Sequence, residues 1–134
     1  MPESRTSVST GTKYEFQFGY SRAVRQGNVI RVAGTAGLGE NGQVVSDDVV
    51  EQMRRALEIV RNALEKLGGT LDDVIMTRIY VSDVRNIDSV AMVHGEVFRE
   101  IRPASSIVRV DFIDPKIQVE VEAEALLGGK RENA

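Results

Sequence analysis

Apolar and polar residues alternate along several stretches of the chain in the manner of β-strands. On both sides of the turn signal Gln26-Gly27-Asn28, the stretch AVRQGNVIRVAG predicts two strands joined by a tight turn. The same alternation marks residues 73–83 (DVIMTRIYVSD), 105–112 (SSIVRVDF) and 117–127 (IQVEVEAEALL). The pattern therefore predicts five strands, with a second turn at Asn41-Gly42.

Two stretches between these strands carry apolar residues at helical spacing. The first covers about 48–67, where Asp48 followed by Glu51 resembles a capping box. The second covers about 86–101 and ends before Pro103, because proline cannot continue a helix. The positions that define the two stripes are Val49, Met53, Ala56, Leu57, Val60, Ala63, Leu64 and Leu67 in the first, and Ile87, Val90, His94, Phe98 and Ile101 in the second.

The order strand–strand–helix–strand–helix–strand–strand predicts an α+β fold, in which two helices cover one face of a mixed sheet. The length suits one domain with one core, so we expect a single domain over residues 1–134. Residues 1–12 are rich in serine and threonine, and residues 128–134 follow the last apolar run. Both ends are expected to be loose tails.

The last predicted strand separates apolar from acidic residues. Glu120, Glu122 and Glu124 share one face, and the intervening valines and alanines share the other. Because the helices should cover the apolar face, the acidic face is expected to meet water or a partner subunit. Two interpretations stay open. One is a general acid–base carboxylate whose pKa is raised by burial. The other is a solvated face whose charges pair with basic residues such as Arg78 and Arg109.

Composition limits the chemistry of the chain. It has 134 residues, no cysteine, one histidine and a formal net charge of −3. Disulfides, a cysteine nucleophile and a multi-histidine metal site are therefore excluded. The negative charge and an aromatic content of 5% disfavour nucleic acid as a partner. The sequence shows neither a signal-peptide pattern nor a membrane span, so we expect a cytoplasmic protein that binds no membrane.

Four further residues are candidates for a small-molecule site. Tyr20 and Arg22 have the same parity in GYSRAV, and a phenol beside a guanidinium suits a small carboxylate. The simpler alternative is a turn tyrosine and a surface arginine. Thr35 lies among small residues in VAGTAG, where backbone can approach a ligand or form a bulge. His94 falls on an apolar helical stripe, where histidine is more often a core or interface residue than a catalytic one.

Three motifs taken together resemble the Rid (reactive intermediate deaminase, or YjgF) family in their order and spacing. They are GYSRAVRQGNVIRVAG, TRIYVSD, and RPASSIVRV followed by VEVEAEA, within about residues 18–127. The resemblance implies a chorismate-mutase-like α+β fold and a homotrimer whose sheets form a central barrel. It also implies clefts between subunits that bind small carboxylates or 2-imino acids. Active members hydrolyse reactive enamines and imines there to 2-keto acids and ammonia, without a metal or organic cofactor.

The resemblance assigns roles to individual residues. Tyr20 matches the cleft tyrosine, Thr35 falls on a segment whose backbone lines the cleft, and Glu120 matches the glutamate that positions water. Ser105 departs from the pattern, because active members carry an arginine there that grips the substrate carboxylate. Ala91 stands where an asparagine is common. The missing arginine argues against ordinary deaminase activity.

A second arginine is a candidate to replace the missing one. Arg22 is favoured because it shares parity with Tyr20, whereas Arg102 lies three residues before Ser105, on the opposite side of an extended chain. The predicted site thus comprises Tyr20, Arg22, Thr35, His94, Arg102, Ser105 and Glu120. Three functions stay open: a cofactor-free enamine or imine deaminase, a non-catalytic metabolite-binding trimer, and an RNA-directed translation inhibitor or endoribonuclease. Charge and aromatic content disfavour the last of these.

Overall fold

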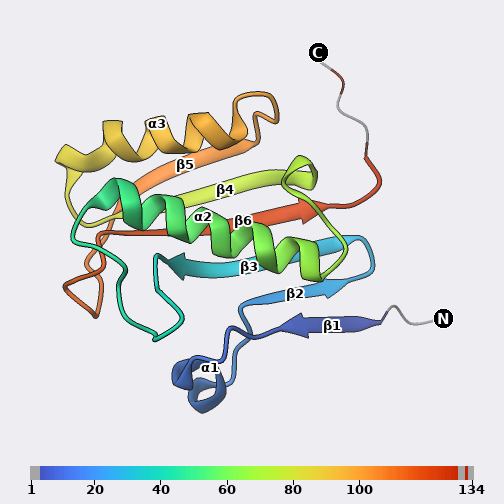
Figure 1. Cartoon of the computed structure of the whole chain (residues 1–134). Helices are drawn as coiled ribbons and strands as arrows, with labels where there is room; N and C mark the ends of the chain where they lie inside the picture. Colours follow the sequence, from blue (N-terminus) through green and yellow to red (C-terminus); the bar gives the residue numbers. More distant parts are fainter. Residues whose placement is uncertain (1–3, 130–131, 133–134) are drawn as a thin grey trace.

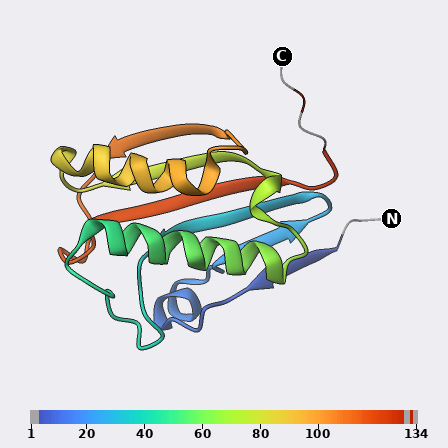
Figure 2. The same ribbon diagram turned by 45° about the horizontal axis from the view of Figure 1, so that its top comes forward.

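The structure is a computed structural model that describes residues 4–129 and 132. Its sheet has the strand order β1-β2-β3-β6-β4-β5, and every neighbouring pair is antiparallel except β4 and β5. Figures 1 and 2 show that α2 and α3 cover one face of this sheet. The strands are β1 Arg5–Val8, β2 Ala23–Gln26, β3 Val29–Ala36, β4 Val74–Val81, β5 Ala104–Arg109 and β6 Val119–Leu126. The helices are α1 Lys13–Phe18, α2 Val49–Lys66 and α3 Ile87–Phe98, with short 3₁₀ turns at Leu71–Asp73 and Val84–Asn86.

The predicted fold class is confirmed, and so are the five predicted strands and two predicted helices. The expectation of a loose tail at 1–12 is wrong for Arg5–Val8, which pair with β2. This strand was missed because three of its four residues are polar and exposed, so no alternation marks it. Residues 1–3, 130–131 and 133–134 of the two predicted tails lie outside the described residues.

The short helix α1 lies beside the start of β2 and was also not predicted (Figure 1). It begins after Thr12, whose side chain accepts a hydrogen bond from the Glu15 N–H, and it ends at Gly19. Gly19 has φ of 75°, a left-handed conformation that favours glycine. These two signals fix a helix in a segment whose aromatic residues face outward: Tyr14, Phe16 and Phe18 are all exposed.

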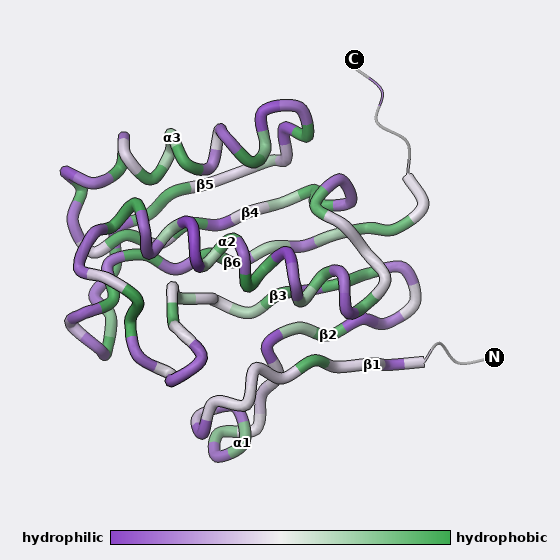
Figure 3. Tube along the Cα trace, in the orientation of Figure 1, coloured by the Kyte–Doolittle hydropathy of each residue, from purple (hydrophilic) through white to green (hydrophobic). Residues whose placement is uncertain are grey.

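Helix α2 forms where the apolar stripe predicts it. Asp48 caps the helix, but its carboxylate accepts from the Val50 N–H at 2.8 Å, not from that of Glu51 as the capping-box pattern predicts. The stripe packs onto β3 and β6, and its polar side faces outward (Figure 3). Gln52 is the polar exception, because it is fully buried in the same interface.

Gln52 ties α2 to the segments around it. Its side-chain nitrogen donates to the Ser46 carbonyl at 2.8 Å and to the Lys116 carbonyl at 3.0 Å, and its oxygen accepts from the Gln118 N–H at 2.9 Å. The buried amide is therefore satisfied, and it fixes where β6 begins relative to the helix. Asn86 precedes α3 as predicted, but its side chain makes no capping bond and instead donates to Gln118 at 3.3 Å.

The two faces of β6 differ as the sequence predicts. Val119, Val121, Ala123 and Ala125 are buried beneath the helices, and the three intervening glutamates are half-buried on the opposite face. We call this second face, which α2 and α3 leave uncovered, the outer face. None of the helices within the described residues combines the length and apolar character that a membrane crossing requires.

Candidate functional site

The outer face carries a row of charges from three neighbouring strands. Arg78 on β4 lies 3.3 Å from a Glu122 oxygen on β6, and Tyr80 donates its hydroxyl hydrogen to the same carboxylate. Arg31 on β3 lies 3.1 Å from Glu124. The predicted pairing of the glutamate row with Arg78 therefore occurs. Arg109 is instead in register with Val81, which is buried under the helices, and Arg31 provides the second cation.

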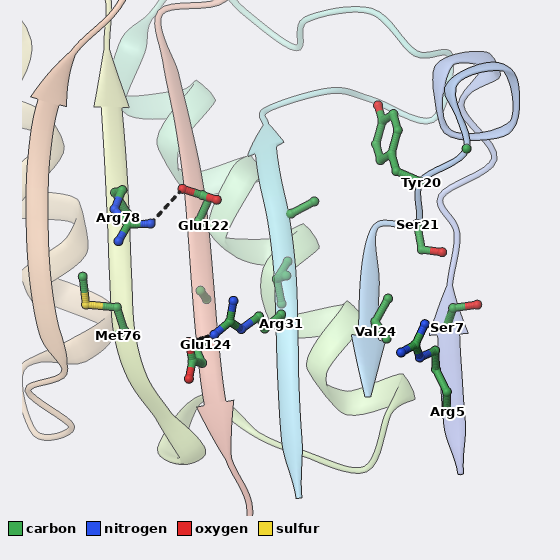
Figure 4. Close-up of a pocket in the computed structure, with 14 residues that line it drawn as sticks. Arg5, Ser7, Tyr20, Ser21, Val24, Arg31, Met76, Arg78, Glu122 and Glu124 are labelled. Carbon is green, nitrogen blue, oxygen red and sulfur yellow. Dashed lines mark hydrogen bonds and ion pairs between the residues drawn. The ribbon is translucent and has the colours of Figure 1, made fainter. Parts of the chain in front are cut away.

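A groove of about 620 Å³ runs over this face. Figure 4 shows Arg78 on β4 pointing to Glu122 on the neighbouring strand β6, with Tyr20 at the far side of the groove. Tyr20 is partly exposed, and its ring centroid lies 5.8 Å from the Arg22 Cζ atom. The polar lining comes from Arg5, Ser7, Tyr20, Ser21, Arg31, Arg78, Glu122 and Glu124.

Glu120 differs from the other two glutamates. Burial raises the pKa of its carboxyl, the charge of Glu122 raises it further, and the charge of Arg22 opposes both. Within the described residues, Glu120 has no hydrogen bond or ion pair. Gly34 on β3 makes room for it, because a methyl group there would come within 2.8 Å of a Glu120 oxygen. The arrangement suits a carboxylate that exchanges a proton with a small molecule beside it.

Arg22 is not the surface arginine that the simpler interpretation of the sequence proposes. It is buried, with 7% of its surface exposed, and its Nη1 donates to the Gly34 carbonyl at 2.6 Å and to Thr35 Oγ1 at 3.0 Å. Its Nε lies 3.7 Å from the buried Glu15 carboxylate. Only Nη2 has no partner within the described chain. A two-bond grip on a substrate carboxylate would therefore have to break one of these contacts.

Thr35 is part of the same cluster. It is buried, it accepts from Arg22, and its hydroxyl donates to the Ala33 carbonyl at 2.7 Å. The pairing of β3 with β6 shifts register between Val32 and Thr35, and the arginine holds the irregular segment. The bulge proposed as the alternative for VAGTAG is therefore present, and the Thr35 side chain serves to hold it.

Glu15 is a residue of this cluster that the sequence analysis missed. The signal was Thr12-x-x-Glu15, the spacing of a capping box. Thr12 Oγ1 donates to the Glu15 carboxylate at 2.9 Å, and the Thr10 N–H donates to it at 3.2 Å. Burial alone would raise its pKa, but hydrogen bonds from Thr10, Ser9 and Thr12 outweigh burial and lower the pKa below its ordinary value of 4.5.

The lowered pKa of Glu15 predicts a loss of stability in acid. A carboxyl whose folded pKa is depressed contributes its full stability above its unfolded pKa, near 4.5, and loses it as the pH falls through the folded value. Urea unfolding between pH 7 and pH 3 should therefore show a steeper acid decline for the parent protein than for Glu15→Gln. The exposed Glu40→Gln is the control and should keep the parent slope. Parallel curves for the parent and Glu15→Gln would contradict the assignment.

His94 and Ser105 lie together, but on the helix-covered side of the sheet. Thr77 on β4 joins them: its Oγ1 is 2.7 Å from Ser105 Oγ and 2.9 Å from His94 Nε2. Thr77 shares its parity with the buried Ile79 and is itself fully buried. Thr77 was not predicted as a site residue, because threonine is common in strands. A polar residue at an inward-facing strand position was the available signal.

Arg102 stands apart from both groups. It follows α3 in a left-handed conformation with φ of 55°, and its N–H donates to the Phe98 carbonyl at 2.8 Å. Its side chain is exposed and makes no hydrogen bond or ion pair within residues 4–129 and 132. The predicted site residues thus form two groups. Tyr20 and Glu120 lie on the outer face, next to the buried contact between Arg22 and Thr35 at the register shift of β3, and His94 with Ser105 lies on the helix-covered side.

Comparison with known proteins defines the class. Residues 12–127 match the family model described as endoribonuclease L-PSP. The chain is 33% identical over 107 residues to 3-aminoacrylate deaminase RutC of Acinetobacter baylyi. The aligned region covers 79% of this chain and 85% of that protein. It is 35% identical over 107 residues to a RutC family protein of Pyrococcus abyssi, with 79% and 84% covered.

A solved structure agrees with the sequence relatives. The structure of a member of the YjgF/YER057c/UK114 family from Mycobacterium tuberculosis matches with a TM-score of 0.85 and 46% identity, over 92% of this chain and all of that one. The chain belongs to this family, the YjgF or Rid family, as the motifs predicted. In the part of the chain that the structure describes, no group of three or more His, Asp or Glu side chains could hold a metal ion.

Proposed function

We propose that the chain is a cytoplasmic homotrimer that binds small carboxylates or imino and keto acids between its subunits. We further propose that it hydrolyses reactive enamines and imines to keto acids and ammonia without a cofactor. The observation that carries this proposal is Glu120, a half-buried carboxylate with a raised pKa and no protein partner among the described residues. The name of the Acinetobacter relative, 3-aminoacrylate deaminase, supports the reaction class.

The separation of the two groups supports a site made by two subunits. Tyr20 and Glu120 lie on the outer face, and His94 and Ser105 lie under the helices. One chain cannot bring opposite faces of a sheet to the same ligand. We propose that the outer-face group of one subunit meets the Ser105 side of the next. Arg102 would then approach the ligand from the second subunit, and Arg22 Nη2 from the first.

The proposed reaction needs one group that moves a proton. The enamine tautomerises to the imine, which takes up a proton from solvent to become the iminium. Water adds to the iminium carbon while Glu120 accepts a proton from that water, which gives the neutral carbinolamine. Glu120 then returns this proton to nitrogen, ammonia leaves as the C=O bond forms, and the hydroxyl proton of the carbinolamine passes back to solvent. A carboxyl whose pKa is raised by burial is a stronger base than an ordinary carboxyl, and so accepts a proton from water more readily.

Glu120→Gln tests this role. The amide keeps the size of the side chain but cannot accept the proton, so ammonia release from freshly generated 2-aminoacrylate should fall about 100-fold or more. Binding of 2-oxobutanoate, measured by calorimetry, should remain. Glu124→Gln is the matched control, because Glu124 lies on the same strand face but pairs with Arg31. Equal ammonia release by Glu120→Gln and the parent would refute the proposal.

A non-catalytic binding protein is the second candidate, and the Ser105 side of the site favours it. The Ser105 hydroxyl offers neutral hydrogen bonding, where an arginine would offer a charge and two parallel bonds. A ligand bound without turnover would raise the unfolding free energy by about 2.7 kcal/mol at one hundred times its Kd. Such stabilisation by 2-oxobutanoate, with ammonia release equal to that in buffer, would select this second function.

A further inference from the structure

Ser105, Thr77 and His94 form a continuous chain of hydrogen-bonding groups, which we call the hydroxyl chain. The two distances, 2.7 Å from Ser105 Oγ to Thr77 Oγ1 and 2.9 Å from Thr77 Oγ1 to His94 Nε2, are those of well-formed hydrogen bonds. Each comes from a different element, β5, β4 and α3. The three side chains are therefore brought together by the tertiary fold and not by a local turn.

The fold holds each residue of the hydroxyl chain in place. The parallel pairing of β4 with β5 sets Thr77 directly opposite Ser105. The His94 ring packs against Phe98 one helical turn further on, with ring centroids 4.6 Å apart. Thr77 is fully buried in the middle, whereas Ser105 is exposed at one end. The chain thus connects an accessible hydroxyl to a partly buried imidazole through a hydroxyl that water does not reach.

The chemistry of the three groups suits proton movement in one direction. In the structure the Thr77 hydroxyl donates to Ser105 Oγ. A hydroxyl both donates and accepts, so rotation of the two hydroxyl hydrogens lets Ser105 donate to Thr77 while Thr77 donates to His94 Nε2. Burial lowers the pKa of His94, so the neutral ring, whose unprotonated nitrogen accepts a hydrogen bond, is the favoured form. A nucleophilic hydroxyl requires such a base within hydrogen-bond reach, directly or through one intervening group.

We propose that Ser105 is a nucleophile, activated through Thr77 by His94, and that it acts on small activated carboxylic esters. Ser105 Oγ would form a bond to the ester carbonyl carbon. Its proton would pass to Thr77 while the Thr77 proton passes to His94. The leaving alkoxide would take its proton from water, and the hydroxide formed would hydrolyse the acyl-serine. His94 would then return its proton through Thr77 to the freed Ser105 oxygen. The net reaction is ester plus water to acid plus alcohol. It does not depend on Glu120 and goes beyond the proposed deaminase function.

Diisopropyl fluorophosphate tests the proposal directly, because it phosphorylates activated serines and leaves ordinary ones unmodified. The Oγ–P bond forms, the P–F bond breaks, fluoride leaves, and the serine proton moves to His94. We expect one diisopropylphosphoryl group per chain, located on Ser105 by peptide mass mapping. Ser105→Ala should take up none. Ser106→Ala is the matched control, because Ser106 is the next residue of β5 and lies opposite Arg78; it should label at the parent rate.

Variants of the other two residues separate activation from simple exposure. Thr77→Val removes the relay hydroxyl and should slow labelling about 100-fold or more, the contribution typical of general-base catalysis. Thr77→Ser restores a hydroxyl at the same position and should recover most of the rate. His94→Gln keeps a polar group near the Nε2 position but no base, and should be as slow as Thr77→Val. If Thr77→Val does not fold, His94→Gln alone shows whether labelling of Ser105 depends on the base.

Three outcomes would overturn the proposal. The first is no adduct on the parent protein under conditions that fully label a known serine hydrolase. The second is an adduct on a residue other than Ser105. The third is a labelling rate at Ser105 that is unchanged in the His94→Gln protein and in the Thr77→Val protein where that variant folds. That result would mean that the hydroxyl chain only satisfies buried polar groups.

Discussion

Arg22→Ala is expected to lower the free energy of unfolding by about 3 kcal/mol, because it removes the buried cation beside Glu15 and leaves two acceptors without their donor. Glu15 is the residue left behind, with 2% of its surface exposed. The Gly34 carbonyl and the Thr35 hydroxyl would also lose their donor. These losses concern two elements at once, since Glu15 belongs to α1 and Gly34 to β3.

Urea unfolding measures this loss, and Arg31→Ala is the matched control. Arg31 also pairs with a glutamate on the sheet, but its side chain is 74% exposed, so its removal should cost less than about 1 kcal/mol. Arg22→Lys should recover only part of the stability, because an ammonium cannot reproduce the fork of bonds to Gly34, Thr35 and Glu15. Equal unfolding midpoints for Arg22→Ala and Arg31→Ala would mean that the buried cluster contributes little.

Gly37→Ala is expected to destabilise the protein by about 3 kcal/mol, at the upper end of the usual cost of overpacking. The added Cβ would lie 2.8 Å from the Gln52 Cα and 2.9 Å from its carbonyl carbon, and it would also clash with the carbonyl oxygen. These are backbone atoms of α2, which cannot turn aside as a side chain can. Gln52 is also held by three hydrogen bonds to two segments, one before α2 and one before β6, so the helix has little freedom to shift.

Gly95→Ala provides the comparison for Gly37→Ala. Gly95 lies in the interior of α3, and a Cβ there would meet only the end of the Arg99 side chain, at 3.9 Å. Alanine should therefore stabilise this helix by about 0.5–1 kcal/mol. Thermal unfolding of both variants would show shifts of opposite sign. A Gly37→Ala protein as stable as the parent would mean that α2 moves away from β3 more easily than its contacts indicate.

The elements that could be predicted from the sequence are those with one buried and one exposed face, because their apolar and polar residues then follow a helical or strand periodicity. The stripe from Val49 to Leu67 and the alternation in β6 are strong patterns, because each element has one dry face. The strand Arg5–Val8 has no buried face, so its residues show no alternation that would predict it. In α1 the aromatic residues Tyr14, Phe16 and Phe18 alternate as in a strand, yet Thr12 and Gly19 impose a helix. Local capping overrode periodicity there.

The site was predictable only in part, and for a similar reason. Tyr20, Arg22 and Glu120 were singled out by parity and by resemblance. In the structure Tyr20 and Arg22 lie just before β2, and the charge of Arg22 acts on Glu120 of β6. The burial of Arg22 depends on Glu15, which comes from another element. Thr77 gained its meaning only from the parallel pairing with Ser105. Contacts between segments that are far apart in the chain cannot be predicted from the residue pattern of a single sequence.

The outermost strands of the sheet, β1 and β5, bear on how the molecule meets its neighbours. Each leaves one row of backbone N–H and C=O groups open to an added strand, which is a common route to aggregation. β1 is only four residues long and carries Arg5, and β5 carries Ser106 and Arg109, all exposed. Short, charged and hydroxyl-rich margins of this kind discourage growth of the sheet by strand addition. A second copy of the chain is therefore expected to bind across the broad surfaces of the sheet and not to extend it sideways.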